Sequence, residues 1–301
     1  MAGVARLCER ELVLDRAAGT LPAILARRPY VAFVATAADG RPAGVCFGSA
    51  ADSDTGAPEG FLDLLVVDRD CQRHGVGREL VAALERDLAS LGCQRVLIAG
   101  HGPYYAWPGI DIHYTAAVCF AEDLGYERRE CEVNMDVDLR VVSLDTRADE
   151  ARLCAAGIEV RSGAAADEAP LRESLSATWQ PTWIAEVAAA LRTEGAGLQV
   201  ALAGSHCVGF CAYGVRRLHE IGPLGTSPSA RGQGIGSVLL RRCLAEQGRR
   251  GVSTAELVWA GPLSYFSRML RAAIGRAFWL YEKDLTQRER APGWRDRIGL
   301  L

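Results

Sequence analysis

A glycine-rich segment that occurs twice is the feature that most constrains the fold of this 301-residue chain. Residues 226–237 read Thr-Ser-Pro-Ser-Ala-Arg-Gly-Gln-Gly-Ile-Gly-Ser, and residues 67–77 read Val-Asp-Arg-Asp-Cys-Gln-Arg-His-Gly-Val-Gly. Three pairs are each 159 positions apart: Gln72 and Arg231, Gly75 and Gly234, and Gly77 and Gly236. A repeat at the length of a domain indicates two related domains in one chain.

Each copy lies between an apolar strand and an amphipathic helix. After the second copy, Ile235, Val238, Leu239 and Leu240 recur at helical spacing, as Val76, Leu80, Val81 and Leu84 do after the first. The first N–H groups of a helix have no intrahelical acceptor, and glycine lets a ligand approach the backbone, so the turns are typical of anion sites. The alternative for a single copy is a tight bend and nothing more.

Both copies fit the pattern Q/R-x-x-G-x-G/A, and with it the chain resembles the GCN5-related N-acetyltransferases, here as two domains in tandem. The second copy is the closer match, because Pro228 stands three residues before Arg231, where the first copy has Arg69. In that family the turn and helix hold the pyrophosphate of acetyl-coenzyme A, and the preceding strand holds its pantetheine arm. The resemblance therefore implies acetyl-coenzyme A as acyl donor and the following donor-binding residues: Leu224, Gly225, Thr226, Arg231, Gly232, Gln233, Gly234, Ile235, Gly236 and Ser237, with Leu65, Val66, Val67, Gln72, Arg73, His74, Gly75, Val76, Gly77 and Arg78 in the first copy.

Composition excludes several other classes of function. Charged residues make up 24% and hydrophobic residues 49% of the chain, and no stretch approaches the roughly 20 apolar residues of a membrane span. The N-terminus lacks the apolar core of a signal peptide, so we expect a cytoplasmic protein without a membrane partner. The net charge of −3 argues against a nucleic-acid surface. The ten cysteines form no C-x-x-C pair and the five histidines show no ligand spacing, so we expect no metal.

The order of predicted elements favours the α+β class with a mixed α/β sheet. We expect a first domain over residues 1–140, a linker with a short helix over 141–157, a second domain over 158–287 and a tail over 288–301. Asp39-Gly40 predicts a hairpin turn, and the strand after each long helix is expected to be parallel to the strand before it. Further expectations are a strand within residues 7–15, two paired strands over 126–139, a helix over 262–273 and a last strand over 278–285.

Acyl transfer to an amine needs a base, because an ammonium group is not a nucleophile. The candidate bases are Glu220 and Asp63, which lie on the strands before the two turns. Glu220 is an even number of residues from Thr226, and Asp63 from Val67, so each carboxylate is expected on the same face of its strand as that residue. The alternative for both is edge exposure or a salt bridge.

The family's usual acid is a tyrosine four residues before a glycine on a later helix, which makes Tyr265 the candidate. No glycine stands at position 269, so Phe266 could equally occupy that place. In the first domain the corresponding place is Ala121, unless a tyrosine from the loop that follows the next strand supplies the hydroxyl.

That loop, residues 101–114, contains three tyrosines, a tryptophan, two histidines and two prolines. Bulky aromatic side chains in a loop need burial or a ligand. We expect an acceptor site for an amino sugar or a similar amine here, formed by Tyr104, Tyr105, Trp107, Asp111 and His113. The alternative is that these rings pack between the two domains.

The sequence thus predicts an acetyl-coenzyme A-dependent N-acetyltransferase that acts on the primary amine of a small molecule. One alternative is an enzyme with one catalytic and one degenerate scaffold domain. Another is a non-catalytic sensor or interaction module that binds acyl-coenzyme A. For the assembly, we expect a monomer whose two domains form a pseudo-dimer.

Overall fold

The computed structural model describes residues 1–15, 18–26, 30–52 and 56–286, so the predicted tail over 288–301 lies outside the described residues. The chain divides into two compact units. Unit 1 comprises Met1–Glu132 and Ala277–Leu301, and unit 2 comprises Val133–Arg276. None of the helices within the described ranges combines the length and apolar character that crossing a membrane requires.

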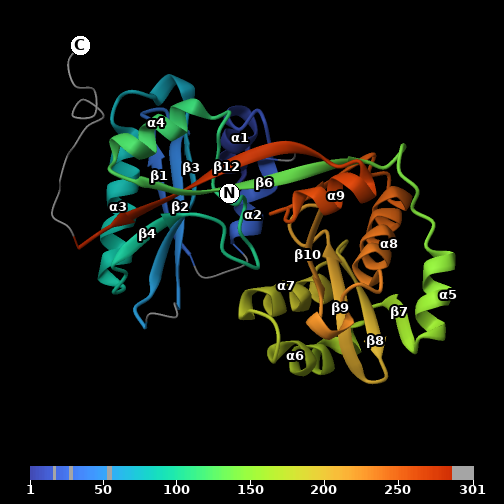
Figure 1. The fold of residues 1–301 in the computed structure, drawn as a ribbon. Coiled ribbons are helices and arrows are strands. Elements are labelled where there is room, and N and C mark those ends of the chain that lie inside the picture. Colours follow the sequence, from blue (N-terminus) through green and yellow to red (C-terminus); the bar gives the residue numbers. More distant parts are fainter. Residues whose placement is uncertain (16–17, 27–29, 53–55, 287–301) are drawn as a thin grey trace, which may run out of the picture. The chain divides into compact units, whose positions relative to one another are not determined.

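Unit 1 is a mixed sheet with helices on both faces (Figure 1). Its strand order is β1-β2-β3-β4-β12-β6, where β12 is Ala273–Asp284, and the short β5 pairs with β12. Its elements are α1 (Ala2–Glu11), η1 (Ala18–Thr20), α2 (Leu21–Leu25), β1 (Val31–Thr36), β2 (Pro42–Ala51), β3 (Glu59–Val67), η2 (Arg69–Cys71), α3 (Val76–Ser90), β4 (Arg95–Ile98), β5 (Ile110–Asp111), α4 (Thr115–Asp123) and β6 (Glu127–Asp138).

The two faces of the unit 1 sheet bury different apolar clusters. Val45 and Phe47 of β2 pack with α1 and α2, whereas Cys46 between them packs with Leu80 and Leu84 of α3. Successive side chains of a strand point to opposite faces, and residues 43–49 of β2 are all buried, so this strand is covered on both sides.

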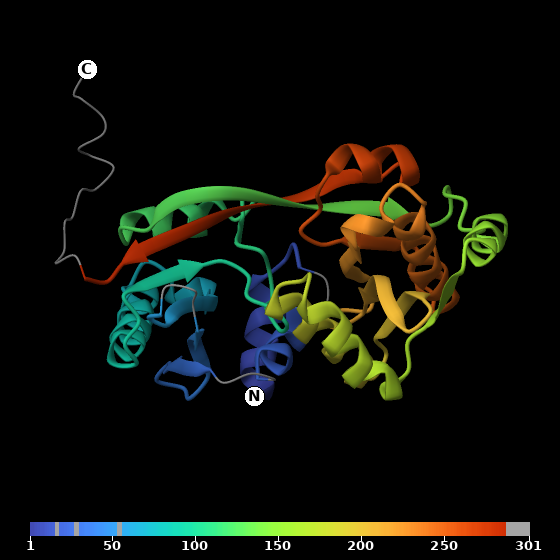
Figure 2. The ribbon, with the colours of Figure 1, turned by 60° about the horizontal axis from the view of Figure 1, so that its bottom comes forward.

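Unit 2 repeats this plan with the strand order β6-β11-β10-β9-β8-β7. The helix α8 lies against its sheet (Figure 2). Val238, Leu239 and Leu240 of α8 are fully buried. Its elements are α5 (Arg147–Ala155), β7 (Ile158–Ser162), η3 (Ala165–Asp167), α6 (Glu168–Ser176), α7 (Pro181–Arg192), β8 (Gly197–Ala203), β9 (His206–Tyr213), β10 (Glu220–Thr226), η4 (Pro228–Ala230), α8 (Ile235–Arg249), β11 (Thr254–Leu257) and α9 (Leu263–Leu270), with the first part of β12 up to Arg276.

Two long strands, β6 and β12, contribute to both units. Residues 133–138 of β6 belong to unit 2, and residues 277–284 of β12 belong to unit 1. The division by contacts therefore differs from the expected ranges of 1–140 and 158–287. The reason is that Tyr281 and its neighbours pair with Ile98 and the rest of β4, a long-range pairing that local sequence patterns do not specify.

Several predicted elements are confirmed. The hairpin across Asp39-Gly40 joins β1 to β2, with Gly40 at φ +82°, a conformation that suits glycine. The strand after each long helix is parallel to the one before it, as the pairs β3–β4 and β10–β11 show. The linker helix is present as α5.

Other predicted elements are wrong in type or extent. The strand expected within residues 7–15 is not formed, because Val4, Leu7 and Cys8 recur at helical spacing and bury one face of α1. Of residues 126–139, Glu127–Asp138 form one strand, β6, in place of the two that were expected. The helix over 262–273 ends at Leu270, because Arg271 takes a left-handed φ of +52° and the backbone leaves the helix there.

Candidate functional site

The turn between β10 and α8 has the backbone of an anion site. Gly232 and Gly234 have φ values of +80° and +82°, and Gly234 caps α8. The first hydrogen bond of the helix runs from the Val238 N–H to the Gly234 carbonyl, so the amides before Val238 have no intrahelical acceptor. The Arg231 Nε donates to the Thr226 carbonyl over 3.3 Å and so ties the turn to the end of β10.

The turn between β3 and α3 repeats this backbone residue by residue. Gly75 caps α3 at φ +87°, and Arg73 takes φ +64° where unit 2 has Gly232. The Gln72 Nε2 donates to the Val67 carbonyl over 3.0 Å, as Arg231 does to Thr226. The sequence repeat is therefore a repeat of backbone geometry.

The strand before each turn leaves its parallel neighbour early. The β10–β11 register consists of Glu220↔Glu256 and Ile221↔Leu257, and the β3–β4 register consists of Gly60↔Val96 and Phe61↔Leu97. Residues 224–226 continue to pair with β9 on their other side. Within the described part of the chain, no strand pairs with residues 224–226 on the side toward β11. The backbone on this side can therefore form hydrogen bonds with the amide groups of an extended ligand.

The surroundings of the third glycine differ between the turns. A Cβ atom placed on Gly236 would lie 3.3 Å from Thr226 Oγ1 and 3.6 Å from the Tyr265 hydroxyl oxygen. A Cβ atom placed on Gly77 would lie 3.2 Å from Phe120 Cζ and 3.5 Å from Val67 Cγ2. The third glycine thus lies beside two hydroxyl groups in unit 2. In unit 1 it lies beside two hydrocarbon side chains.

Tyr265 lies on α9 with its ring edge-on to Phe266, at a centroid distance of 5.2 Å. Burial raises the pKa of the Tyr265 hydroxyl, and the positive charge of Arg241 opposes part of that shift. The hydroxyl therefore stays protonated at neutral pH. Phe120, on the helix α4 of unit 1, takes the corresponding place beside Gly77, where the sequence indicated Ala121.

Coenzyme A fits the turn of unit 2. Gly236 leaves a space that a side chain would fill, and among the described residues no atom outside the chain neighbours lies within 4 Å of a Cβ atom placed on Gly232. Arg231 adds a cation beside the amides of α8. A diphosphate would lie against that helix terminus, and the peptide groups of residues 224–226 would hold the pantetheine arm.

The structure holds Glu220 in a buried ion network. Its carboxylate accepts hydrogen bonds from Arg216 Nε over 2.9 Å and from Arg217 Nη1, and Arg216 also pairs with Glu186. The expected common face with Thr226 is wrong, because the register with β9 shifts between Ile221 and Leu224. Such a bulge changes the alternation of side chains along the strand.

Asp63 of unit 1 lies at a corresponding shift. In the pairing of β3 with β2, Leu64 lies opposite Phe47 and Leu62 opposite Gly48, so Asp63 is the extra residue between them. Counting residues from Val67 is therefore misleading here as well. The Asp63 carboxylate accepts a hydrogen bond of 2.8 Å from Ser49 Oγ.

A second group of charged residues lies where β10 and β11 pair. His219, Glu220 and Glu256 each offer an atom that could bind a metal ion, and these atoms lie within 4.8 Å of one another. Their carboxylate oxygens are taken by protein donors, because Glu256 accepts from Asn134 over 2.7 Å and pairs with His219 at 3.4 Å. Burial opposes ionisation of Glu256, but the His219 and Asn134 hydrogen bonds and the charge of Arg276 lower its pKa to about 2.

The aromatic loop packs within unit 1. Trp107 Nε1 donates to Asp15 Oδ1 over 2.6 Å, and the Tyr114 hydroxyl donates to Asp15 Oδ2 over 2.7 Å. Tyr105 is buried, and the buried Asp111 pairs with His113 Nδ1 at 2.8 Å, whereas Tyr104 is partly exposed. These contacts give the loop packing and hydrogen-bond partners within its own unit.

Sequence reasoning missed an aromatic group on the α6–α7 side of the unit 2 sheet. Trp179 and Trp183 stack at 5.2 Å, and both meet the ring of Phe210 edge-on. Trp179 Cη2 lies 2.8 Å from where a Cβ atom of Gly225 would be. The sequence signal for this group is the pair of tryptophans four residues apart around the start of α7. Large aromatic side chains at such a place need a partner to cover them.

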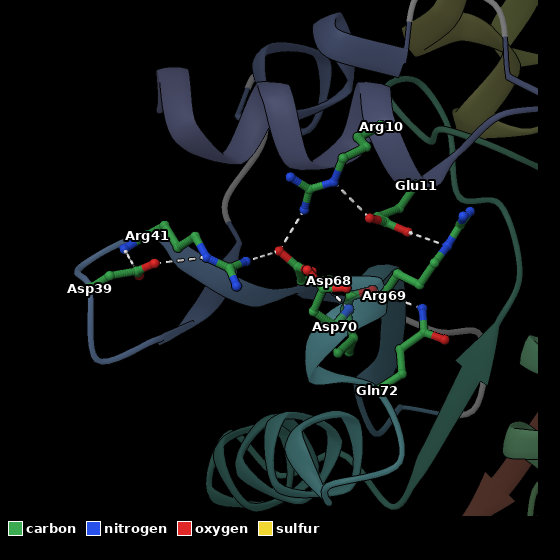
Figure 3. A network of polar contacts seen from close by, with 9 residues as sticks. Arg10, Glu11, Asp39, Arg41, Asp68, Arg69, Asp70 and Gln72 are labelled. Atoms are coloured by element: carbon green, nitrogen blue, oxygen red, sulfur yellow. Dashed lines mark hydrogen bonds and ion pairs between the residues drawn. The ribbon is translucent and has the colours of Figure 1, made fainter.

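Acidic and basic side chains surround the turn of unit 1 (Figure 3). Asp68, 159 positions before Ser227, accepts hydrogen bonds from Arg10 over 2.6 Å, from Arg41 and from the Asp70 amide. The Asp70 amide, followed by the charges of Arg10 and Arg41, lowers the pKa of Asp68. Unit 1 therefore places an ionised carboxylate at its turn where unit 2 has a neutral hydroxyl.

The fold and the two turns identify the family. The profile of the acetyltransferase (GNAT) family matches residues 5–103 and 167–261. The chain therefore belongs to this family, with two of its domains in tandem. None of the curated protein sequences is similar enough to be matched.

Solved structures show the same tandem fold. A tandem GNAT protein from the clavulanic acid biosynthesis pathway has 18% identity and a TM-score of 0.67, with 96% of each chain covered. A GCN5-related N-acetyltransferase from Sphaerobacter thermophilus has 19% identity and a TM-score of 0.61, with 94% of this chain and 91% of that one covered.

A third structure is described as a GCN5-related glucosamine N-acetyltransferase region in a fungal multi-domain GH3 β-N-acetylglucosaminidase. It has 17% identity and a TM-score of 0.75. The match covers 93% of this chain and 36% of the fungal one. Identities at this level establish the shared fold.

Proposed function

We propose that the chain is an acetyl-coenzyme A-dependent N-acetyltransferase whose reaction takes place in unit 2. The observation that carries this proposal is the pair of hydroxyl groups, Thr226 Oγ1 and Tyr265, facing Gly236 at the start of α8. In unit 1 the same position faces Val67 and Phe120, which can neither donate nor accept a proton.

The residues of unit 2 would divide the work as follows. Bound acetyl-coenzyme A supplies an acyl group activated as a thioester. The amides at the start of α8 and Arg231 hold the diphosphate, and the backbone of residues 224–226 holds the pantetheine and polarises the acyl carbonyl. As the new N–C bond forms and the C–S bond breaks, Tyr265 donates its proton to the leaving sulfur.

The acceptor must arrive as, or become, a neutral amine. Because Arg216 and Arg217 occupy the carboxylate of Glu220, we assign the removal of the proton to water and not to Glu220. The rate should then rise with pH through the pKa of the acceptor amine itself. A profile that follows an enzyme group with acceptors of different basicity would contradict this assignment.

We propose a small-molecule primary amine as acceptor, with an amino sugar as the first candidate. Support comes from the structural neighbour described as a glucosamine N-acetyltransferase region. It also comes from Trp179, whose ring lies against Gly225 of β10 beside the proposed pantetheine position. Indole faces commonly cover the apolar face of a sugar ring.

The test combines binding and turnover on the purified chain. Titration calorimetry with acetyl-coenzyme A should show binding, and thiol release should follow with at least one amine from a panel of amino sugars, polyamines and amino acids. Gly236→Val should weaken binding and lower the efficiency of thiol release by about 100-fold or more. Absence of binding by the unaltered chain would refute the proposal outright.

The ion pairs of Glu220 with two arginines favour one other function, a non-catalytic sensor of acyl-coenzyme A, because they leave unit 2 without this carboxylate as a base. Such a module needs the turn but no base. Tight binding without thiol release across the whole panel would support the sensor and refute the enzyme.

A further inference from the structure

The helix α5 connects the sequences of the two domains, yet its placement is more specific than a connection requires. Of its residues only Leu153 is buried. Polar contacts hold the rest on α8: Arg241 pairs with Asp149 at 2.5 Å, Arg242 pairs with Glu150 at 2.9 Å, and Arg241 also donates to the Asp145 carbonyl over 2.8 Å. These contacts fix the side of α8 on which α5 lies (Figure 1).

One side chain of α5 reaches the glycine turn. Arg152 Nη1 donates to the Gln233 carbonyl over 2.9 Å. Its Nη2 would lie 3.0 Å from a Cβ atom placed on Gly234, the residue that caps α8. The guanidinium group therefore lies at Gln233 and Gly234, the two residues that precede the first residue of α8.

The charge of Arg152 is only partly balanced in this position. It pairs with Asp149 at 3.3 Å, and Asp149 also pairs with Arg241. The Arg152 side chain is 53% exposed. A guanidinium has five N–H donors in a planar fork that suits phosphate oxygens, so the side chain retains donors for an anion at the turn.

We propose that Arg152 binds the diphosphate of the acyl-coenzyme A donor, which makes the linker helix α5 part of the donor site of unit 2. This inference rests on the proposed function, because it needs coenzyme A at the α8 turn. It goes beyond the glycine motif, since Arg152 lies 82 positions before the Gly234 that it adjoins. It also predicts that donor binding makes α5 more rigid through the new contact.

The test measures binding of coenzyme A by calorimetry, independently of turnover. We expect Arg152→Gln to weaken binding about 10-fold or more, the usual effect of losing a charge-assisted hydrogen bond. The affinity for S-acetylpantetheine, which lacks the diphosphate, should not change. Arg152→Lys, which keeps the charge without the fork, should give an intermediate affinity.

Arg147→Gln is the matched control. Arg147 is on the same helix, its side chain is 90% exposed, and it pairs with Asp145 at 2.6 Å, so its loss should leave the affinity unchanged. In hydrogen exchange, coenzyme A should protect the amides of α5 in the unaltered chain but not in Arg152→Gln. Equal thermal midpoints would show that the variants fold alike.

The outcomes separate the two proposals. If the unaltered chain binds coenzyme A and Arg152→Gln binds it equally well, the role of Arg152 is overturned while the proposed function stands. Equal losses for coenzyme A and S-acetylpantetheine would also overturn the diphosphate contact. If the unaltered chain does not bind coenzyme A, both proposals are wrong.

Discussion

The two glycine turns share a backbone and differ in nearly everything around it. Gly75 and Gly234 cap their helices with almost the same φ, yet Val67, Asp68 and Phe120 surround one turn where Thr226, Ser227 and Tyr265 surround the other. The two parallel strand pairs also differ: β3 pairs Gly60 with Val96 of β4, whereas β10 pairs Glu220 with Glu256 of β11. The glycines specify a place for an anion, and the neighbouring side chains decide what chemistry can follow.

The largest expected difference between the turns concerns their third glycine. Gly236→Val would fill the space beside Thr226 and Tyr265, and we expect kcat/KM to fall by about 100-fold or more, as for a displaced substrate. Gly77→Val should leave turnover unchanged, since the proposed reaction takes place at the turn of unit 2. Thiol-release kinetics on folded variants would show this, and equal losses at both positions would end the contrast.

Tyr265→Phe places a phenylalanine beside Gly236, as Phe120 lies beside Gly77 in unit 1. Because burial raises its pKa, the hydroxyl is protonated and can donate at neutral pH, and this ability is lost as pH rises above that raised value. We expect kcat to fall by about 100-fold with KM little changed, and the alkaline limb of the pH profile to disappear. Phe120→Tyr is the control and should leave the activity as it was. Unaltered kcat in Tyr265→Phe across the pH range would remove the acid role.

The buried charges of unit 2 should matter for stability. Glu220→Gln leaves Arg216 and Arg217, both almost fully buried, without their shared carboxylate, and we expect a loss of about 3 kcal/mol in the free energy of unfolding. Glu246→Gln, which affects two more exposed arginine pairs, should cost less than about 1 kcal/mol. Denaturant titration compares the two, and similar small losses would mean that the network is not stabilised by its charges.

The smallest effect is the pH dependence that Glu256 gives to unit 2. The pKa of Glu256 is about 2 in the folded chain against an ordinary value of 4.5. Its contribution to stability is therefore present above about 4.5 and is lost as pH falls from there toward 2. Protection factors from hydrogen exchange should fall in β10 and β11 over this range before they fall in β3 and β4. In Glu256→Gln this difference between the units should shrink.

Much of the fold follows from local sequence patterns. The hairpin at Asp39-Gly40, the glycine turns and the amphipathic helices after them each combine a turn signal with a clear apolar period. The proposed donor site is predictable for the same reason, because it consists largely of backbone whose conformation the glycines determine.

The rest depends on contacts that no local pattern encodes. The bulges at Asp63 and near Gly222 disturb the counting that placed Glu220 and Asp63 on a ligand-facing side. Phe120 and Trp179 reach their glycines through tertiary packing, and Asp15 pairs with Trp107 across 92 positions of sequence. Residue spacing within a segment carries no information about such partners.

The shared strand β12 has a consequence for how the protein is made. The ribosome delivers residues 1–132 first, but the strand that pairs with Ile98 and the rest of β4 emerges only after all of unit 2. Until then the nascent first half exposes an unpaired sheet edge, the kind of surface at which chains associate wrongly. The half that begins translation is thus the half that finishes folding last, and a fragment ended at the linker would stay incomplete.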